Sequence, residues 1–148
     1  MMQYHKQKFL HDPDNGIYGD CARTVIACLM DMEPEQVPHF MDGDPDFREF
    51  SRRQNEWLKL HGLGMVEFPV SCASLELCVK SIGPNWMPGI KRYMLTGTSP
   101  RGTTHVVIVD GDKVHDPAIP GGDLVGPTDD GSWWVSVLVP LKIHGESE

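Results

Sequence analysis

The sequence lacks the features that mark membrane, secreted and nucleic-acid-binding proteins. No apolar run approaches the roughly 20 residues that a membrane-spanning helix needs, and no apolar segment follows the first residues as it does in a signal peptide. Lysine and arginine total 13 against 21 aspartates and glutamates, which gives a net charge of −8. Because non-specific nucleic-acid binding rests on neutralised phosphates, we expect a cytoplasmic protein with no nucleic-acid partner and no membrane partner.

Cysteine is also sparse, and its spacing argues against a structural metal or a disulfide framework. The four cysteines include no Cys-x-x-Cys pair, the spacing that zinc sites usually show. The seven histidines are scattered along the chain without ligand spacing. We therefore predict free thiols, as is usual in a cytoplasmic protein, and no metal or other cofactor. The oligomeric state is left open.

Proline and glycine, in contrast, are frequent, with 12 and 15 residues that divide the chain into short elements. The length of 148 residues and the 40% hydrophobic content fit a single domain over residues 1–148. Apolar residues follow helical spacing in the first half and strand patterns in the second half. Expected helices span 20–33, 45–61 and 74–82, and expected strands span 65–70, 92–98, 103–109, 113–116 and 132–141. This order predicts an α+β fold in which N-terminal helices pack on a C-terminal antiparallel sheet.

The helix expected over 45–61 has clear start and stop signals. Asp44 is the expected N-cap, with a proline at the first helical position and a glycine after the last turn. The Gly83-Pro84 pair is expected to end the helix over 74–82. The buried stripe of the helix over 45–61 should consist of Phe47, Phe50, Gln54, Trp57 and Leu58.

Cys21 opens the first expected helix, directly after Gly19-Asp20. The N-terminus of a helix carries a partial positive charge and unpaired N–H groups, and both stabilise a thiolate. Cys21 is therefore the candidate nucleophile. A small apolar residue at the start of a buried helix is the alternative interpretation of the same position.

A base and a partner for that base are present in the stretch from His105 to Asp116. Asp110-Gly111 lies between apolar runs and predicts a β-hairpin with a two-residue turn. Counting back from that turn pairs His105 with Asp116 on one face and points His115 to the other face. The carboxylate can then hold one imidazole nitrogen while the other faces the thiol. A three-residue loop would shift the pairing by one, and a buried strand histidine and a turn-capping aspartate are the alternatives for each residue alone.

Acyl transfer also requires hydrogen-bond donors for the negative oxygen of its tetrahedral intermediate. Asn15 lies six residues before Cys21, and its side-chain amide can donate together with the backbone N–H of Cys21. The alternative is a turn residue, because an Asn-Gly pair favours turns. Asn15 is the candidate oxyanion donor.

These residues resemble known motifs. The stretch from Asn15 to Ala22, Asn-Gly-Ile-Tyr-Gly-Asp-Cys-Ala, resembles the Gln-Gly-x-x-x-x-Cys segment that opens the catalytic helix of papain-like cysteine peptidases. The His105 strand and the later Asp116-Pro117 resemble the His…Asp-Pro pattern of double-glycine bacteriocin-processing peptidases. Asparagine at position 15 replaces the family's glutamine and is shorter by one methylene group.

The resemblance extends over residues 15–125 and includes small bacterial and phage proteins of this type. Similar segments are Asp20 to Leu29, Glu35 to Phe40, Ser99 to Gly102 and His115 to Pro117. The resemblance implies a papain-like fold with a Cys-His-Asp triad, in which the cysteine and the histidine face each other across a cleft. By position, Cys21 is then the nucleophile, His105 the base, Asp116 the orienting residue and Asn15 the oxyanion donor.

We expect a small cysteine hydrolase that cleaves an amide, peptide or isopeptide bond through a thioester. Its substrate would be a peptide, a protein or a small amide. The same thioester could pass to an amine, as in acyltransferases and transglutaminases, or form on a glutamine side chain, as in deamidases. A catalytically inactive interaction module, of phage or host-directed type, is the alternative from a different class.

Overall fold

The computed structural model describes residues 2–142, which form three α-helices, two short 3-10 turns and five β-strands. In chain order these elements are η1 (Pro13–Asn15), α1 (Cys21–Leu29), η2 (Pro34–Gln36), α2 (Phe47–Leu60), β1 (Leu63–Val70), α3 (Leu75–Trp86), β2 (Arg92–Thr98), β3 (Thr104–Asp110), β4 (Lys113–His115) and β5 (Trp133–Pro140). The strands make one antiparallel sheet in the order β1-β5-β2-β3-β4. The fold is therefore α+β, as predicted.

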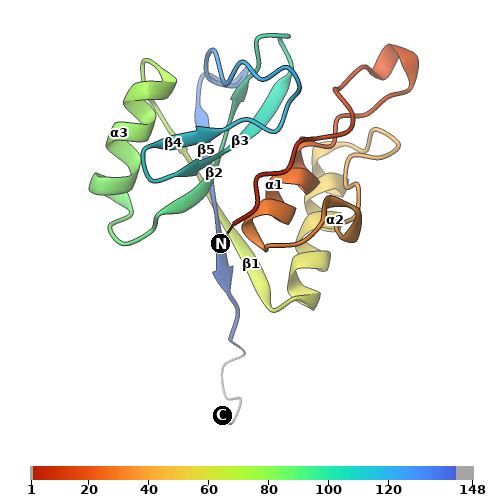
Figure 1. Ribbon diagram of the computed structural model, residues 1–148, viewed down its shortest axis with the longest axis horizontal. Coiled ribbons are helices and arrows are strands. Elements are labelled where there is room, and N and C mark those ends of the chain that lie inside the picture. Colours follow the sequence, from red (N-terminus) through yellow and green to blue (C-terminus); the bar gives the residue numbers. More distant parts are fainter. Residues whose placement is uncertain (1, 143–148) are drawn as a thin grey trace.

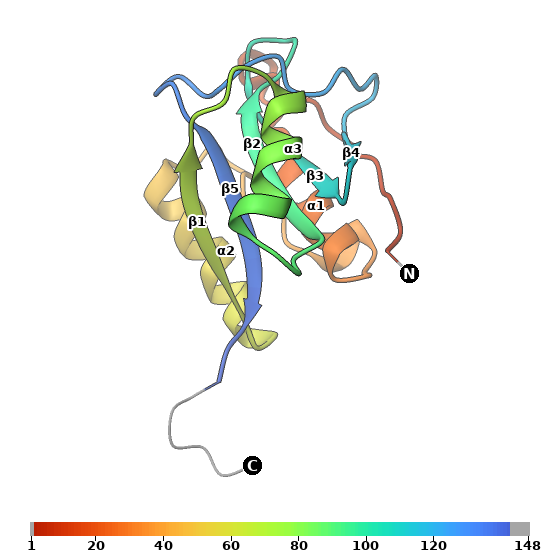
Figure 2. The same cartoon turned by 90° about the vertical axis from the view of Figure 1, so that its left-hand side faces the viewer.

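Helices cover both faces of this sheet. Figures 1 and 2 show α1 and α2 on one face and α3 on the opposite face. The alternation along β3 explains the two layers: Val106 and Ile108 pack with the core of α1 and α2, whereas Val107 and Val109 pack with that of α3. The apolar run of this interior strand, which lies between β2 and β4, is thus buried on both sides.

All three helices differ from their predicted limits, and α1 ends at Leu29 instead of residue 33. The side chain of Asp46, not of Asp44, accepts the N-cap hydrogen bond, from the Glu49 N–H at 2.8 Å. Asp44 has a φ of 55°, which is not the extended conformation of an N-cap residue. The helix therefore starts at Phe47, and this side chain is 79% exposed instead of belonging to the buried stripe.

The third helix is longer than the sequence predicted. It continues through Gly83 to Trp86, where the Met87 N–H closes the last turn on the carbonyls of Ile82 and Gly83. A proline inside a helix lacks the N–H for one hydrogen bond and crowds the preceding turn, and only two helical residues follow Pro84 before α3 ends. The Gly-Pro pair was therefore a wrong stop signal here.

The β3–β4 hairpin has a different register from the predicted one. Its two turn residues are Gly111 and Asp112, so that Asp110 pairs with Lys113 and His115 pairs with Ile108. Gly111 takes the positive φ of 66°, which a glycine adopts at the first turn position at little cost. Asp110 belongs to the strand. The observed pairing is shifted by two residues from the predicted one. A shift of two residues does not change which side chains share a face of the sheet.

Asp110 is held in the strand by contacts from distant parts of the chain. The Tyr4 hydroxyl donates to its Oδ2 at 2.6 Å, and Lys91 and Arg92 form ion pairs with its carboxylate. These contacts explain why the turn starts one residue later than the Asp110-Gly111 signal indicates.

The segment over residues 2–9 joins this hairpin to α1. It runs beside β4, as Figure 2 shows. The Lys6 ammonium donates to the Asp116 carbonyl at 2.7 Å, and the Gln7 N–H donates to the Pro117 carbonyl at 2.8 Å. Two residues later, the Phe9 carbonyl accepts the Asp20 N–H at 3.3 Å. The segment therefore fixes the position of the start of α1 relative to the end of β4.

Candidate active site

Cys21 is the first residue of α1, and its side chain is partly exposed. Asp20 precedes it but does not cap the helix with its side chain. The buried Asp20 carboxylate instead accepts the backbone N–H groups of Lys8 and Phe9 and the Nε–H of Arg23. Because Asp20 is engaged in this way, the N–H groups at the start of α1 are left for a negatively charged group beside Cys21.

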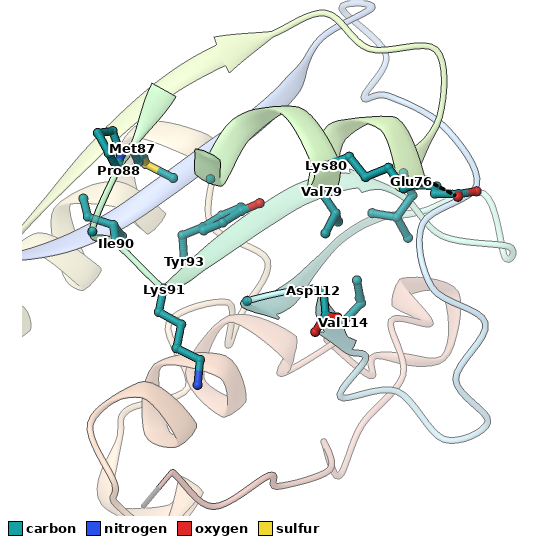
Figure 3. A pocket seen from close by; sticks show the side chains of 14 residues that line it. Glu76, Val79, Lys80, Met87, Pro88, Ile90, Lys91, Tyr93, Asp112 and Val114 are labelled. Atoms are coloured by element: carbon teal, nitrogen blue, oxygen red, sulfur yellow. Dashed lines mark hydrogen bonds and ion pairs between the residues drawn. The ribbon is translucent and has the colours of Figure 1, made fainter. Parts of the chain in front are cut away.

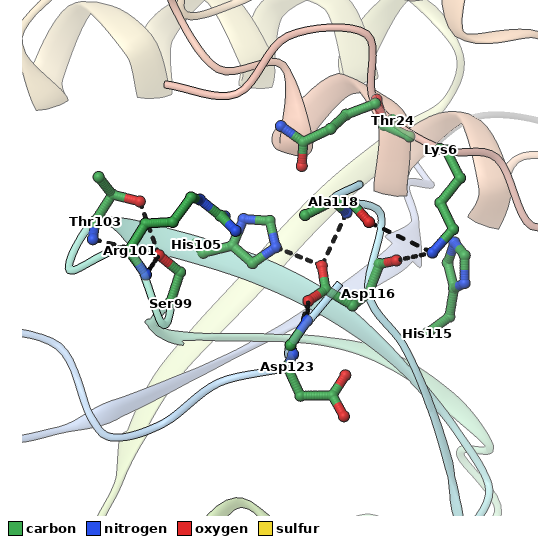
Figure 4. A network of polar contacts seen from close by, with 12 residues as sticks. Lys6, Thr24, Ser99, Arg101, Thr103, His105, His115, Asp116, Ala118 and Asp123 are labelled. Atoms are coloured by element: carbon green, nitrogen blue, oxygen red, sulfur yellow. Dashed lines mark hydrogen bonds and ion pairs between the residues drawn. The ribbon is translucent and has the colours of Figure 1, made fainter. Parts of the chain in front are cut away.

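His105 and Asp116 are joined by a short hydrogen bond. His105 lies at the start of β3, and Asp116 directly follows β4. The distance from His105 Nε2 to Asp116 Oδ1 is 2.6 Å, and the two residues are 3% and 6% exposed. Figure 4 shows the imidazole pointing toward this carboxylate. Because Nε2 is occupied, Nδ1 is the ring nitrogen that remains for a second partner.

The Cys21 thiol acts on the same imidazole. Burial by itself would lower the pKa of His105, but hydrogen bonds with Asp116 and with the Cys21 thiol raise this pKa to about 9. The imidazolium is therefore the main form of His105 at neutral pH. A cation beside a sulfur atom at a helix N-terminus is the environment in which a cysteine acts as a nucleophile.

Asp116 also organises the loop that follows it. Its carboxylate accepts backbone N–H groups from Ala118 at 2.9 Å, from Gly122 at 3.0 Å and from Asp123 at 2.8 Å. Burial would raise the pKa of Asp116, but the hydrogen bonds from His105, Gly122 and Ala118 lower it far below its ordinary value. The loop is thus built around an ionised carboxylate that holds His105 in one orientation.

The structure does not bring Asn15 to Cys21, His105 and Asp116. Asn15 ends η1 on an exposed turn, and its Nδ2 donates to Asp12 Oδ2 at 2.8 Å. Its function as an oxyanion donor stays a prediction, and its amide would have to leave Asp12 to perform it.

Gln7 is a residue of this region that the sequence analysis did not assign. It is only 7% exposed, and its backbone is bonded to Pro117, the neighbour of Asp116. Its Nε2 donates to the Phe9 carbonyl, which also accepts the N–H of Asp20. Its Oε1 has no hydrogen-bond partner among the described residues. This buried amide therefore lies between the Asp116 loop and the start of α1.

The other cysteines do not share the environment of Cys21. All four thiols are free. Burial raises the pKa of Cys28, and it raises the pKa of Cys78 strongly, with a further rise from the neighbouring thiol of Cys72. Within residues 2–142, no cluster of three or more His, Cys, Asp or Glu side chains is arranged to hold a metal ion.

A large cavity lies away from these residues. It has a volume of about 1010 Å³ and lies between α3 and the β3–β4 hairpin. Figure 3 shows Val79, Met87, Ile90 and Val114 around it, with Tyr93 at its floor. Burial raises the pKa of Tyr93 to about 12, and its hydroxyl has no partner in residues 2–142. The groove is mainly apolar and contains none of the candidate catalytic side chains.

No helix in the described residues is both long enough and apolar enough to cross a bilayer. Comparison of the chain with protein-family models, with curated proteins and with solved structures finds no match. The geometry around Cys21 is therefore the feature that bears on function.

Proposed function

We propose that the protein is a papain-like cysteine hydrolase that cleaves an amide, peptide or isopeptide bond. The supporting observation is the series of contacts from Asp116 through His105 to Cys21 at the start of α1. A nucleophile, a base and a group that orients the base are the three parts that such chemistry requires. Here they come from three separate segments of the chain, which meet only in the folded protein.

In the first half of the reaction, the Cys21 sulfur attacks the carbonyl carbon of the bond to be cleaved. The C–N bond then breaks, and the imidazolium of His105 gives its proton to the leaving amine. In the second half, His105 takes a proton from water, and the resulting hydroxide displaces the Cys21 sulfur from the thioester. Asp116 keeps Nε2 protonated throughout, so that Nδ1 carries out both proton transfers.

The negative oxygen of each tetrahedral intermediate requires donors, and Gln7 is positioned to supply one. Its Nε2 uses one N–H for the Phe9 carbonyl and has a second N–H for the oxyanion. The backbone N–H of Cys21, at the uncapped helix start, supplies another. We assign the side-chain donor to Gln7 because Asn15 is bonded to Asp12 on the exposed turn.

The test is the reactivity of the four cysteines with iodoacetamide at pH 6, followed by intact mass and peptide mapping. Cys21 should be alkylated at least about tenfold faster than Cys28, Cys72 and Cys78, because it alone combines a helix N-terminus with an imidazolium. Equal labelling of all four thiols would refute the proposal.

Two histidine variants separate catalysis from a general effect on folding. His105→Ala should remove most of the preferential labelling of Cys21. His115→Ala is the matched control, because His115 pairs with Ile108 and its Nε2 contacts the His5 carbonyl at 2.8 Å, away from the thiol. If His115→Ala abolishes the preference and His105→Ala retains it, the base is wrongly assigned.

A further inference from the structure

Arg101 lies on a rigid turn directly before the strand that carries His105. The turn is closed by hydrogen bonds between Ser99 and Gly102 and between Ser99 and Thr103, at 2.9 Å and 2.8 Å. The hydroxyl of Ser99, a residue that is 1% exposed, accepts the N–H groups of Arg101 and Thr103 and bonds the Thr103 hydroxyl. The backbone of Arg101 is therefore fixed by a buried polar cluster.

The side chain of Arg101 has a free cationic end near the proposed site. The residue is exposed, and its guanidinium has no hydrogen bond or ion pair with any other residue in the described range 2–142. Figure 4 shows the side chain extending from the turn toward the imidazole of His105. Among protein side chains, guanidinium is the best match for a carboxylate, because it offers parallel N–H donors.

The charges around His105 favour an exposed cation as the partner of an anionic substrate. The imidazolium is paired with the Asp116 carboxylate, which offsets its positive charge. Lys6 lies close by, but its ammonium is bonded to the carbonyls of Asp116 and Ala118. The whole chain carries a net charge of −8. Arg101 is exposed, and its guanidinium has no other partner in residues 2–142, so it can receive an approaching carboxylate.

We infer that Arg101 is a specificity-determining residue, which binds a carboxylate next to the bond that Cys21 attacks. This inference rests on the proposed function and narrows its substrate class. The substrate carries an acidic side chain or a free α-carboxylate adjacent to the scissile amide. Arg101 forms a charge-assisted pair with this group and aligns the carbonyl carbon with the sulfur.

The experiment compares two alkylating reagents of the same chemistry, iodoacetate and iodoacetamide. In iodoacetate the carboxylate is one bond away from the carbon that the sulfur attacks, so it reports on a cation beside Cys21. The measured quantity is the rate constant for alkylation of Cys21 by iodoacetate divided by that for iodoacetamide, at pH 6.5 and low salt. Arg101→Gln should lower this ratio about fivefold, the range of a partly exposed charge-assisted pair. Arg101→Lys, which keeps the charge, should retain at least half of the preference for iodoacetate.

Arg48→Gln is the matched control, because Arg48 is another exposed arginine and lies in the first turn of α2. It should leave the ratio unchanged. If Cys21 remains the preferred thiol but Arg101→Gln leaves the ratio at the level of the unmodified protein, the inference about Arg101 is refuted and the proposed hydrolase stands. If neither reagent prefers Cys21 over the other cysteines, the proposed function is refuted, and the inference fails with it.

Discussion

Replacement of Asp116 by asparagine should destabilise the protein substantially, although the two side chains have almost the same shape. Two hydrogen-bond donors point at each carboxylate oxygen: His105 and Ala118 at Oδ1, and Gly122 and Asp123 at Oδ2. An asparagine side chain has only one acceptor oxygen. Its NH₂ group must therefore face one of the two pairs of donors.

The less costly orientation turns the NH₂ group toward Ala118 and His105. His105 can respond by moving its proton to Nδ1, but the Ala118 N–H loses its acceptor. A buried unpaired N–H costs roughly 1–3 kcal/mol, and replacing charged hydrogen bonds by neutral ones costs about 1 kcal/mol more. We expect Asp116→Asn to lower the free energy of unfolding by about 2–4 kcal/mol. The same proton movement places an N–H toward Cys21, so the variant should also lose most of its preferential alkylation.

The pKa shifts of Asp116 and His105 determine how the difference in unfolding free energy between the unmodified protein and the variant depends on pH. The pKa of Asp116 is lowered in the folded protein, so its stabilisation is present above its ordinary value of 3.8 and is lost as the pH falls further. The pKa of His105 is raised from 6.5 to about 9, so its stabilisation is complete below 6.5 and is lost as the pH rises through about 9. The difference between the unmodified protein and the variant should therefore be largest between about pH 5 and pH 6.5.

Urea unfolding at pH 3.5, 6 and 9.5 measures this difference. Asp112→Asn serves as the control, since Asp112 is exposed in the turn of the hairpin. The control should unfold with the same free energy as the unmodified protein at all three values. A difference for Asp116→Asn below about 0.5 kcal/mol at pH 6, within the usual range for surface substitutions, would show that Asp116 does not hold its loop as described.

Further predictions concern the oxyanion donor and the packing behind His105. Gln7→Ala should reduce turnover of a substrate, once one is found, by roughly 10- to 1000-fold, as for other single oxyanion donors. Asn15→Ala should change the turnover less than about twofold. The reverse result would assign the oxyanion donor to Asn15. Gly97→Ala should lower the unfolding free energy by about 1–3 kcal/mol, because an added Cβ would lie 2.6 Å from the Gly126 carbonyl oxygen. Gly126→Ala, where an added Cβ meets no atom within 4 Å, should have a near-neutral effect when both variants are unfolded in urea.

Local patterns were sufficient for the class of fold and for most elements. The strand over 92–98 was predicted with its observed limits, since turn signals bound it on both sides in the sequence. The apolar run in β3 predicted a central strand, and the structure buries it on both faces. The proximity of His105 and Asp116 followed from the hairpin pattern even though the register was wrong, since a shift of two residues keeps both on one face.

Contacts between distant segments could not be predicted in this way. The hairpin register depends on Tyr4 and Lys91, which hold Asp110 in the strand, and neither is near it in sequence. Gln7 lies between two lysines, a local pattern typical of an exposed segment, and only the folded chain shows that it is buried. The role of Asn15 as an oxyanion donor stays a prediction, because it relied on the spacing from Cys21 along the chain, which does not give the distance between the two residues in the fold.

The path of residues 10–18 explains why the spacing from Asn15 to Cys21 along the chain does not give their distance in the fold. The chain extends outward after Phe9 and returns at Asp20, whose N–H donates to the Phe9 carbonyl. Between these two residues, Asp12 and Ile17 pair as in a small hairpin. The excursion starts and ends at the same place, and its tip is exposed. A change in the length of this excursion should therefore leave Cys21 in place, and an epitope or a fluorescent peptide inserted at the tip should not disturb the contact between His105 and Asp116.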